Sequence, residues 1–102
     1  MASRLELQTE LEELLGSEEV YFQPPESIKL SYPCIIYEKD NWGIRHADDF
    51  PYKAIPNYQI TIIDRDPDAN WDKQMLEKFR YISISRFFNN DNLYHWVFRL
   101  YY

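Results

Sequence analysis

The chain has 102 residues, of which 45% are hydrophobic and 18% are aromatic. This length suits one domain with a small core, and the apolar content is too high for a disordered chain. Seventeen acidic residues against eleven Lys and Arg give a net charge of −6. This charge argues against a protein that binds nucleic acid by neutralising its phosphates. No run has transmembrane length and the start has no signal-peptide core, so we expect a soluble protein made in a reducing cytoplasm.

The aromatic content is unusual for a domain of this size: nine Tyr, six Phe and three Trp. A small domain rarely buries so many rings completely, and Tyr and Trp are residues that protein–protein interfaces favour. The composition therefore predicts at least one aromatic contact surface.

Residues 3–15 are predicted to form a helix. Ser3 and Glu6 have the spacing of a capping box, and Gly16 provides a stop. Four leucines recur along one face of this helix, at Leu7, Leu11, Leu14 and Leu15. Their spacing predicts a helix that covers the core, with its glutamates in solvent.

Three strands are predicted before the second helix. Residues 20–23 begin a short strand that Pro24 and Pro25 end, residues 32–38 form a second strand, and residues 53–65 contain the longest β segment. Cys34 lies in the second strand, where we expect an inert buried thiol. Between the second and third strands, residues 39–53 are predicted to form a projecting loop or arm.

The apolar residues of the projecting segment are expected to be shielded from solvent. Trp42, Ile44 and Phe50 are costly to leave in water, so either they fold back on the body or a partner covers them. We therefore treat these three residues as candidate interface residues.

A second helix is predicted over residues 69–79. Asp66 or Asp68 is expected to cap it, because carboxylates favour the positive end of a helix. Its buried face is predicted to consist of Trp71, Met75, Leu76 and Phe79.

The chain closes with a predicted hairpin over residues 81–102. Two β-branched and aromatic runs, 81–88 and 93–102, flank the turn-forming residues 89–92. Alternation places one set of bulky residues on one face of the last strand: Tyr94, Trp96, Phe98, Leu100 and Tyr102. These aromatic side chains supply more area than helices of this size can cover, so we expect part of the hairpin to form a protein contact surface. The candidate residues are Tyr94, Trp96, Phe98, Tyr101 and Tyr102.

Taken together, the elements predict an α+β fold. We expect a mixed or antiparallel sheet of about four to five strands, with two helices packed on one face and a C-terminal hairpin.

The case for catalysis or metal binding is weak. Asp64, Asp66 and Asp68 alternate like the start of a calcium loop, but the required glycine and the final bidentate acid are missing. The only histidines, His46 and His95, have no cysteine partner at a zinc spacing. We therefore expect no enzyme, no metal and no cofactor, and the alternative is a small metal-dependent enzyme or regulator that uses these His and Asp residues.

Several runs of residues resemble those of a known family in their order and spacing. The resemblance covers nearly the whole chain from Phe22. They are Tyr32-Pro33-Cys34-Ile35-Ile36-Tyr37, then Ala47-Asp48-Asp49 with Tyr52 and Tyr58, Ile63-Asp64-Arg65-Asp66-Pro67-Asp68, Asp91-Asn92-Leu93-Tyr94-His95, and Leu100-Tyr101-Tyr102. The chain resembles small neck-module proteins of long-tailed phages and prophages of low-GC Gram-positive bacteria.

The resemblance implies a tail terminator, also called a tail completion or tail-to-head joining protein. Such proteins are α+β, form a hexameric ring that caps the tail tube, stop tube polymerisation and present the docking surface for the filled head. The implied partners are further copies of the chain, the tail tube protein and the head-completion or connector protein of the neck. The implied location is the virion, after assembly in the host cytoplasm, with no membrane involved.

In such a ring the DNA passes through the lumen without specific binding. An acidic lumen repels phosphates, so we expect Asp48 and Asp49, or the acids of the first helix, to line the channel. The nearest alternative is another neck component, such as a head-closure or connector ring protein.

Overall fold

The computed structural model describes residues 4–24, 29–39 and 57–102. The elements in chain order are α1 (Arg4–Leu15), β1 (Val20–Phe22), β2 (Cys34–Lys39), β3 (Asn57–Asp64), α3 (Trp71–Lys78), β4 (Ile82–Asn90) and β5 (Leu93–Tyr101). The strands form one mixed five-stranded sheet in the order β1-β2-β3-β5-β4. Only β1 and β2 pair in parallel, and the other described pairs are antiparallel. The predicted α+β fold with a C-terminal hairpin is confirmed.

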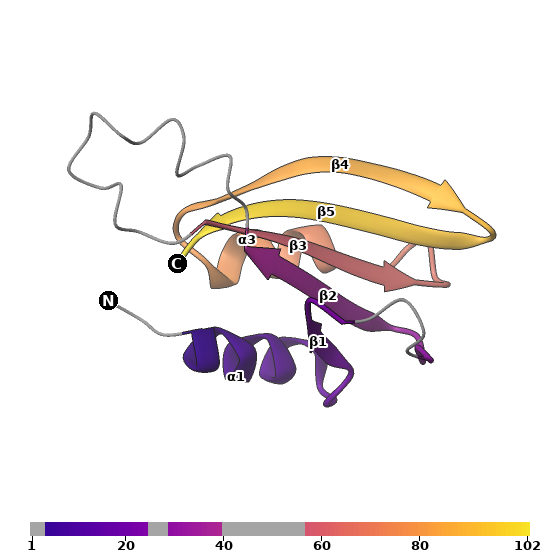
Figure 1. The fold of residues 1–102 in the computed structure, drawn as a ribbon. Coiled ribbons are helices and arrows are strands. Elements are labelled where there is room, and N and C mark those ends of the chain that lie inside the picture. Colours follow the sequence, from indigo (N-terminus) through magenta and orange to yellow (C-terminus); the bar gives the residue numbers. More distant parts are fainter. Residues whose placement is uncertain (1–3, 25–28, 40–56) are drawn as a thin grey trace.

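Both described helices pack on the same face of the sheet. In Figure 1, α3 lies behind β3 and β5, and α1 lies along the lower side near β1. Leu7 and Leu11 of α1 and Met75 of α3 belong to one buried cluster with Ile60 and Ile62 of β3. This layer between helices and sheet is the main core, and the residues that face it alternate along β2, β3 and β5.

Helix α1 forms as predicted. Leu7 and Leu11 are fully buried, and Leu14 and Leu15 pack against the same core from the edge. Gly16 ends the helix with φ +78°, and its N–H donates to the Glu12 carbonyl at 2.9 Å. Glycine adopts this left-handed conformation without a steric penalty. Ser3, the predicted capping residue, lies outside the described residues.

Two predictions about helix α3 are wrong. Asn70 is the N-cap, with no side-chain capping bond, so neither Asp66 nor Asp68 caps the helix. Instead, Asp64 organises the preceding turn, because its carboxylate accepts from the backbone N–H of Arg65 at 2.7 Å and from the Trp71 indole N–H at 2.8 Å.

The second error concerns the buried face of α3. Leu76 is 47% exposed, while Met75 is fully buried and Phe79 is 7% exposed. The helix is only eight residues long, and it contacts the sheet through a narrow stripe that Leu76 does not share.

The terminal hairpin turns through two residues. Asp91 and Asn92 have φ of 55° and 64°, the positive values that a tight two-residue turn requires. Asn89 and Asn90, predicted to belong to the turn, are the last residues of β4. One irregularity interrupts the pairing, because Ile84 lies opposite Phe98 and Arg86 opposite Val97, which leaves Ser85 as an extra residue. This is a β-bulge near the middle of β4.

Candidate interaction surface

Several predicted site residues lie outside the described residues. These are the candidate interface residues Trp42, Ile44 and Phe50, the candidate channel residues Asp48 and Asp49, and His46. Of the arm predicted over residues 39–53, only Lys39 is described, as the last residue of β2.

The five aromatic residues predicted for the interface on β5 have different environments. Trp96 is 4% exposed and Phe98 is fully buried, both in the core beneath the helices. In this structure they hold the fold together and present no surface to a partner. Tyr94 and Tyr102 are half-buried against the same core, and Tyr101 points to solvent.

Tyr102 joins the end of the hairpin to helix α1. Its hydroxyl donates a hydrogen bond to the Glu10 carboxylate, and its ring meets Phe79 edge-on with centroids 6.1 Å apart. Burial and the neighbouring Glu10 carboxylate raise the pKa of the Tyr102 hydroxyl, because both disfavour a phenolate. These contacts hold the hairpin end against the helix layer.

Three exposed apolar residues that the sequence analysis missed lie on or beside β4. Tyr81 is 65% exposed, Phe87 50% and Ile84 43%. Phe87 rests on the rings of Tyr94 and Trp96, with centroid separations of 5.9 and 5.0 Å. One signal was available in the sequence, because serines alternate with isoleucines in residues 82–85 and such polar alternation is typical of a strand with solvent on one side.

The two outer edges of the sheet differ. At β1 the Val20 N–H donates to the Glu18 carbonyl at 2.8 Å, and the Val20 carbonyl accepts from the Gln8 side chain at 2.9 Å. The strand has only three residues, and Pro24 follows closely. By contrast, β4 has nine residues, and within the described ranges no segment pairs with its outer side. A free edge of that length can pair with another strand.

A hollow of about 310 Å³ adjoins the free edge on the helix side. It is lined by Pro67, Ala69, Asp72, Ile84, Phe87 and Trp96. Ile84 and Phe87 of β4 line one side of the hollow, so the hollow is continuous with the outer edge of β4. A strand placed beside β4 can therefore bury side chains in the hollow as well as pair its backbone.

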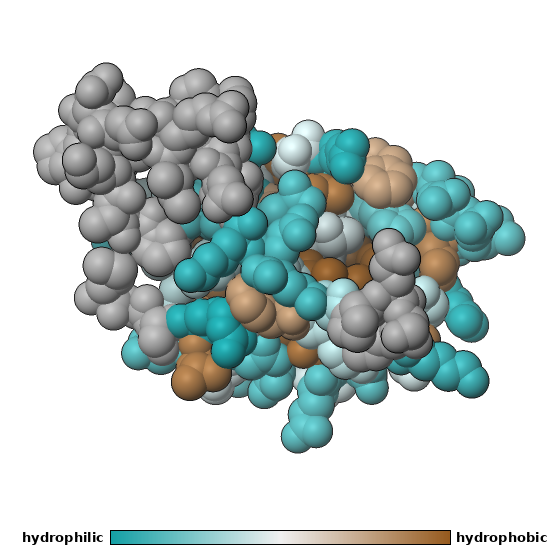
Figure 2. Space-filling view, viewed as in Figure 1, coloured by the Kyte–Doolittle hydropathy of each residue, from teal (hydrophilic) through white to brown (hydrophobic). Residues whose placement is uncertain are grey.

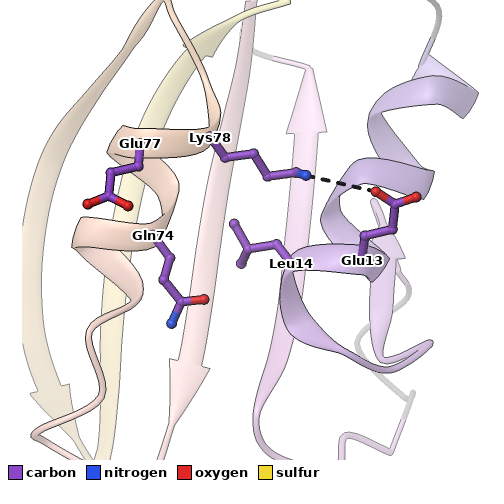
Figure 3. Close-up of a pocket in the computed structure, with 5 residues that line it drawn as sticks. All are labelled: Glu13, Leu14, Gln74, Glu77 and Lys78. Carbon is purple, nitrogen blue, oxygen red and sulfur yellow. Dashed lines mark ion pairs between the residues drawn. The ribbon is translucent and has the colours of Figure 1, made fainter.

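A second hollow, of about 410 Å³, lies between the two helices. Figure 3 shows Leu14 pointing into it, with Lys78 of α3 reaching across to Glu13 of α1. The Lys78 Nζ and the nearer Glu13 carboxylate oxygen are 3.9 Å apart. Because both partners are solvent-exposed to a considerable degree, with side-chain exposures of 27% and 67%, this ion pair contributes little stability. The hollow has charged residues at its mouth and no buried polar group that would select a ligand.

The sheet face opposite the helices is mixed in character. Figure 2, seen from this side, shows hydrophilic and hydrophobic surface intermixed over the strands. Phe88 and His95 stack with ring centroids 4.6 Å apart, and the Arg86 guanidinium lies 5.2 Å from the Phe88 ring centre. Cys34 is fully buried on this face, and burial raises the pKa of its thiol to about 12. The prediction of a buried thiol is confirmed, and the raised pKa keeps the thiol protonated at neutral pH.

No chemical centre is assembled in the part of the chain that the structure describes. Among those residues, no three His, Cys, Asp or Glu side chains are grouped so that they could hold a metal ion. His95 Nδ1 lies 3.1 Å from the Leu93 carbonyl, and the Asp64 carboxylate serves the turn before α3. In the same residues, neither helix is long and apolar enough to cross a membrane.

Comparisons with known proteins give no match: no family model, no curated protein and no solved structure is significantly similar to this chain.

Proposed function

We propose that this protein is a tail terminator, which forms a ring at the head-proximal end of a phage tail tube, stops tube polymerisation and provides the docking surface for the head. The sequence resemblance, which extends from Phe22 to Tyr102, suggests this role. The observation that carries it is the presence of exposed apolar residues at separate places on an acidic subunit.

A closed ring in which each copy contacts its neighbours head to tail needs two different surfaces on each subunit. The helix layer exposes Leu5 to 66% and Leu76 to 47%. The β4 region exposes a second group, Tyr81, Ile84 and Phe87. These two groups lie on different elements, as a head-to-tail contact requires.

The charge distribution supports a lumen that does not hold DNA. Helix α1 carries four glutamates, Glu6, Glu10, Glu12 and Glu13, and the whole chain has a net charge of −6. If the outer side of α1 lines the channel, the phosphates are repelled and DNA passes freely. The partners in this proposal are further copies of the chain in a hexamer, the tail tube protein and the head-completion protein.

Deletion of the gene from its phage or prophage tests the proposal. We expect tail tubes of unregulated length that fail to join heads, and rescue by the wild-type gene supplied from a plasmid. Tubes of normal length would contradict the proposal. As a direct test, purified protein is added to tubes assembled from the tail tube protein of the same genome. Electron microscopy should show a cap at one tube end, whereas binding to the portal end of heads alone would indicate a head-closure protein.

A further inference from the structure

The pairing of β4 with β5 determines which β4 residues direct their backbone N–H and C=O groups to the outer edge of the sheet. The Tyr101 N–H donates to the Tyr81 carbonyl at 3.0 Å, so these two residues form a hydrogen-bonded pair. In an antiparallel ladder such pairs recur at every second residue. The backbone groups of Ser83 are therefore directed toward β5, and those of Ile82 and Ile84 away from it.

In the second half of β4, the directions of the backbone groups follow from the geometry of the hairpin turn. With a two-residue turn, Asn90 belongs to the hydrogen-bonded pair that closes the hairpin. Counting back by two, Phe88 and Arg86 also direct their backbone groups toward β5. Phe87 and Asn89 direct theirs outward.

The bulge sets the spacing of the outward residues. Because Ser85 is an extra residue, Ile84 and Phe87 are three positions apart, while the other outward neighbours are two apart. A regular strand directs backbone N–H and C=O groups to one side at every second residue. Such a strand can therefore match the outward groups of β4 on one side of the three-residue gap but not on both sides. A second β4 running antiparallel carries the same gap at its centre. Ile82 then lies opposite Asn89, and Ile84 opposite Phe87, so that all four outward positions find a partner.

We propose that β4 pairs with β4 of a second copy of this chain, joining two five-stranded sheets into one continuous sheet. The two-fold axis stands perpendicular to the sheet and passes between Ser85 and Arg86. Both helix layers then lie on the same side of the joined sheet.

The side chains suit this pairing. Ile84 of one copy lies beside Phe87 of the other, and pairs of a β-branched residue with an aromatic residue stabilise antiparallel sheets. Arg86 lies opposite Ser85 of the other copy, so no like charges face each other directly. Residues 82–90 contain no acid and one arginine, so two edges of this kind meet with little repulsion. The pairing also covers the hollow beside Ile84 and Phe87.

The pairing is distinct from the proposed ring. A ring that caps a tube has two different faces and no two-fold axis across it, so a symmetric contact between two β4 strands does not belong to that ring. The paired form is a state of the protein outside any such ring. The inference therefore does not depend on the proposed function.

Disulfide trapping tests the register. Two full-length variants, Ile84→Cys and Phe87→Cys, are prepared separately and then mixed under mild oxidation. A hydrogen-bonded antiparallel pair has Cα atoms about 5.5 Å apart, within disulfide reach. When either variant pairs with itself, the two introduced thiols are offset by three residues, roughly 10 Å, and are beyond reach. We expect roughly tenfold more cross-linked dimer in the mixture than in either variant alone.

A matched control uses Ser83→Cys mixed with Phe87→Cys. Ser83 is exposed but directs its backbone toward β5 and its side chain to the other sheet face, so this mixture should remain monomeric in a non-reducing gel. Cys34 is buried in every variant, and circular dichroism verifies that each variant is folded. Equal cross-linking in the control and test mixtures would overturn the proposal.

Sedimentation of the wild-type chain provides the second measurement. We expect a dimer at high protein concentration that dissociates on dilution, and its loss on Phe87→Pro, which removes an outward N–H without removing a bond to β5. A monomer at all concentrations overturns the proposal, and so does a dimer that cross-links no better in the test mixture than in the single variants. Either failure leaves the test for tube capping unaffected.

Discussion

Strands β4 and β5 are two halves of one hairpin with the same length, yet their environments are opposite. In β5, Trp96, Val97, Phe98 and Leu100 are buried, whereas β4 has no buried residue. Composition accounts for part of the difference, because β5 has seven apolar residues among its nine and β4 has four. Position in the sheet adds to it, because β5 lies between β3 and β4, while β4 has one neighbour in the described part of the sheet. The comparison shows that the burial of an aromatic residue depends on the place of its strand in the sheet as well as on the strand's sequence.

The largest expected effect contrasts one phenylalanine from each strand. Phe98→Ala removes a fully buried ring and should lower the free energy of unfolding by about 3–5 kcal/mol. Phe87→Ala removes a half-exposed ring and should cost about 1 kcal/mol or less. Urea unfolding at low protein concentration measures both. Similar losses for the two variants would contradict the assignment of β5 to the core and β4 to the surface.

The next effect concerns the β1 edge, the counterpart of the free β4 edge. Gln8 donates to the Val20 carbonyl and accepts a hydrogen bond from the Tyr37 hydroxyl. Gln8→Ala leaves both partners in a partly buried site and should cost about 1–3 kcal/mol. Thr9→Ala, at the adjacent exposed position, should stay within about 0.5 kcal/mol of wild type. Equal values for the two variants would indicate that Gln8 does not close this edge.

The third prediction uses pH to test the contact between the hairpin end and α1. The pKa of Tyr102 is raised above its ordinary value of 10.0 in the folded protein. Above pH 10 the unfolded chain loses this proton first, so stability falls as the pH rises toward the folded-state pKa. Tyr102→Phe should therefore lose less stability than wild type between neutral and strongly alkaline pH. Parallel pH profiles for the two proteins would contradict the contact with Glu10.

The smallest expected effect is at the turn that joins the two strands. Asn92 has φ 64°, and glycine at this position of a two-residue turn adopts positive φ more readily. Asn92→Gly should raise the melting temperature slightly, corresponding to about 0.5 kcal/mol or less. The control Asn89→Gly, inside β4, should lower stability, because glycine weakens a strand interior. The opposite order of the two melting temperatures would place the turn elsewhere.

Much of the fold follows from local sequence patterns. The leucine spacing of α1, the alternation in residues 58–62 and the turn before Leu93 each specify an element through contacts within a few residues. The order of strands does not follow in this way. Pairing of β1 with β2 and of β3 with β5 depends on long-range contacts, and alternation states which residues share a face without stating which strand lies beside them.

The candidate surface was predicted less well for the same reason. Trp96 and Phe98 are large aromatic residues of the predicted surface, and they lie in the core because the helices cover their side of β5. Ile84 and Phe87 look equally apolar in sequence and are exposed, because β4 lies at an edge. Asp64, which begins the incomplete match to a calcium loop, accepts hydrogen bonds from Trp71 and from its own turn, a role that depends on the position of α3. The arm residues from Trp42 to Phe50 lie outside the described residues, so their proposed contacts remain predictions.

The bulge in β4 has a consequence for amide hydrogen exchange. Amides directed toward β5, such as those of Ser83, Arg86 and Phe88, should exchange slowly, and those directed outward, such as those of Ile84 and Phe87, should exchange rapidly. The alternation of slow and fast amides along the strand should shift by one residue at Ser85. Nuclear magnetic resonance can therefore locate the bulge residue by residue, and slowing of the outward amides with rising protein concentration would report pairing of this edge.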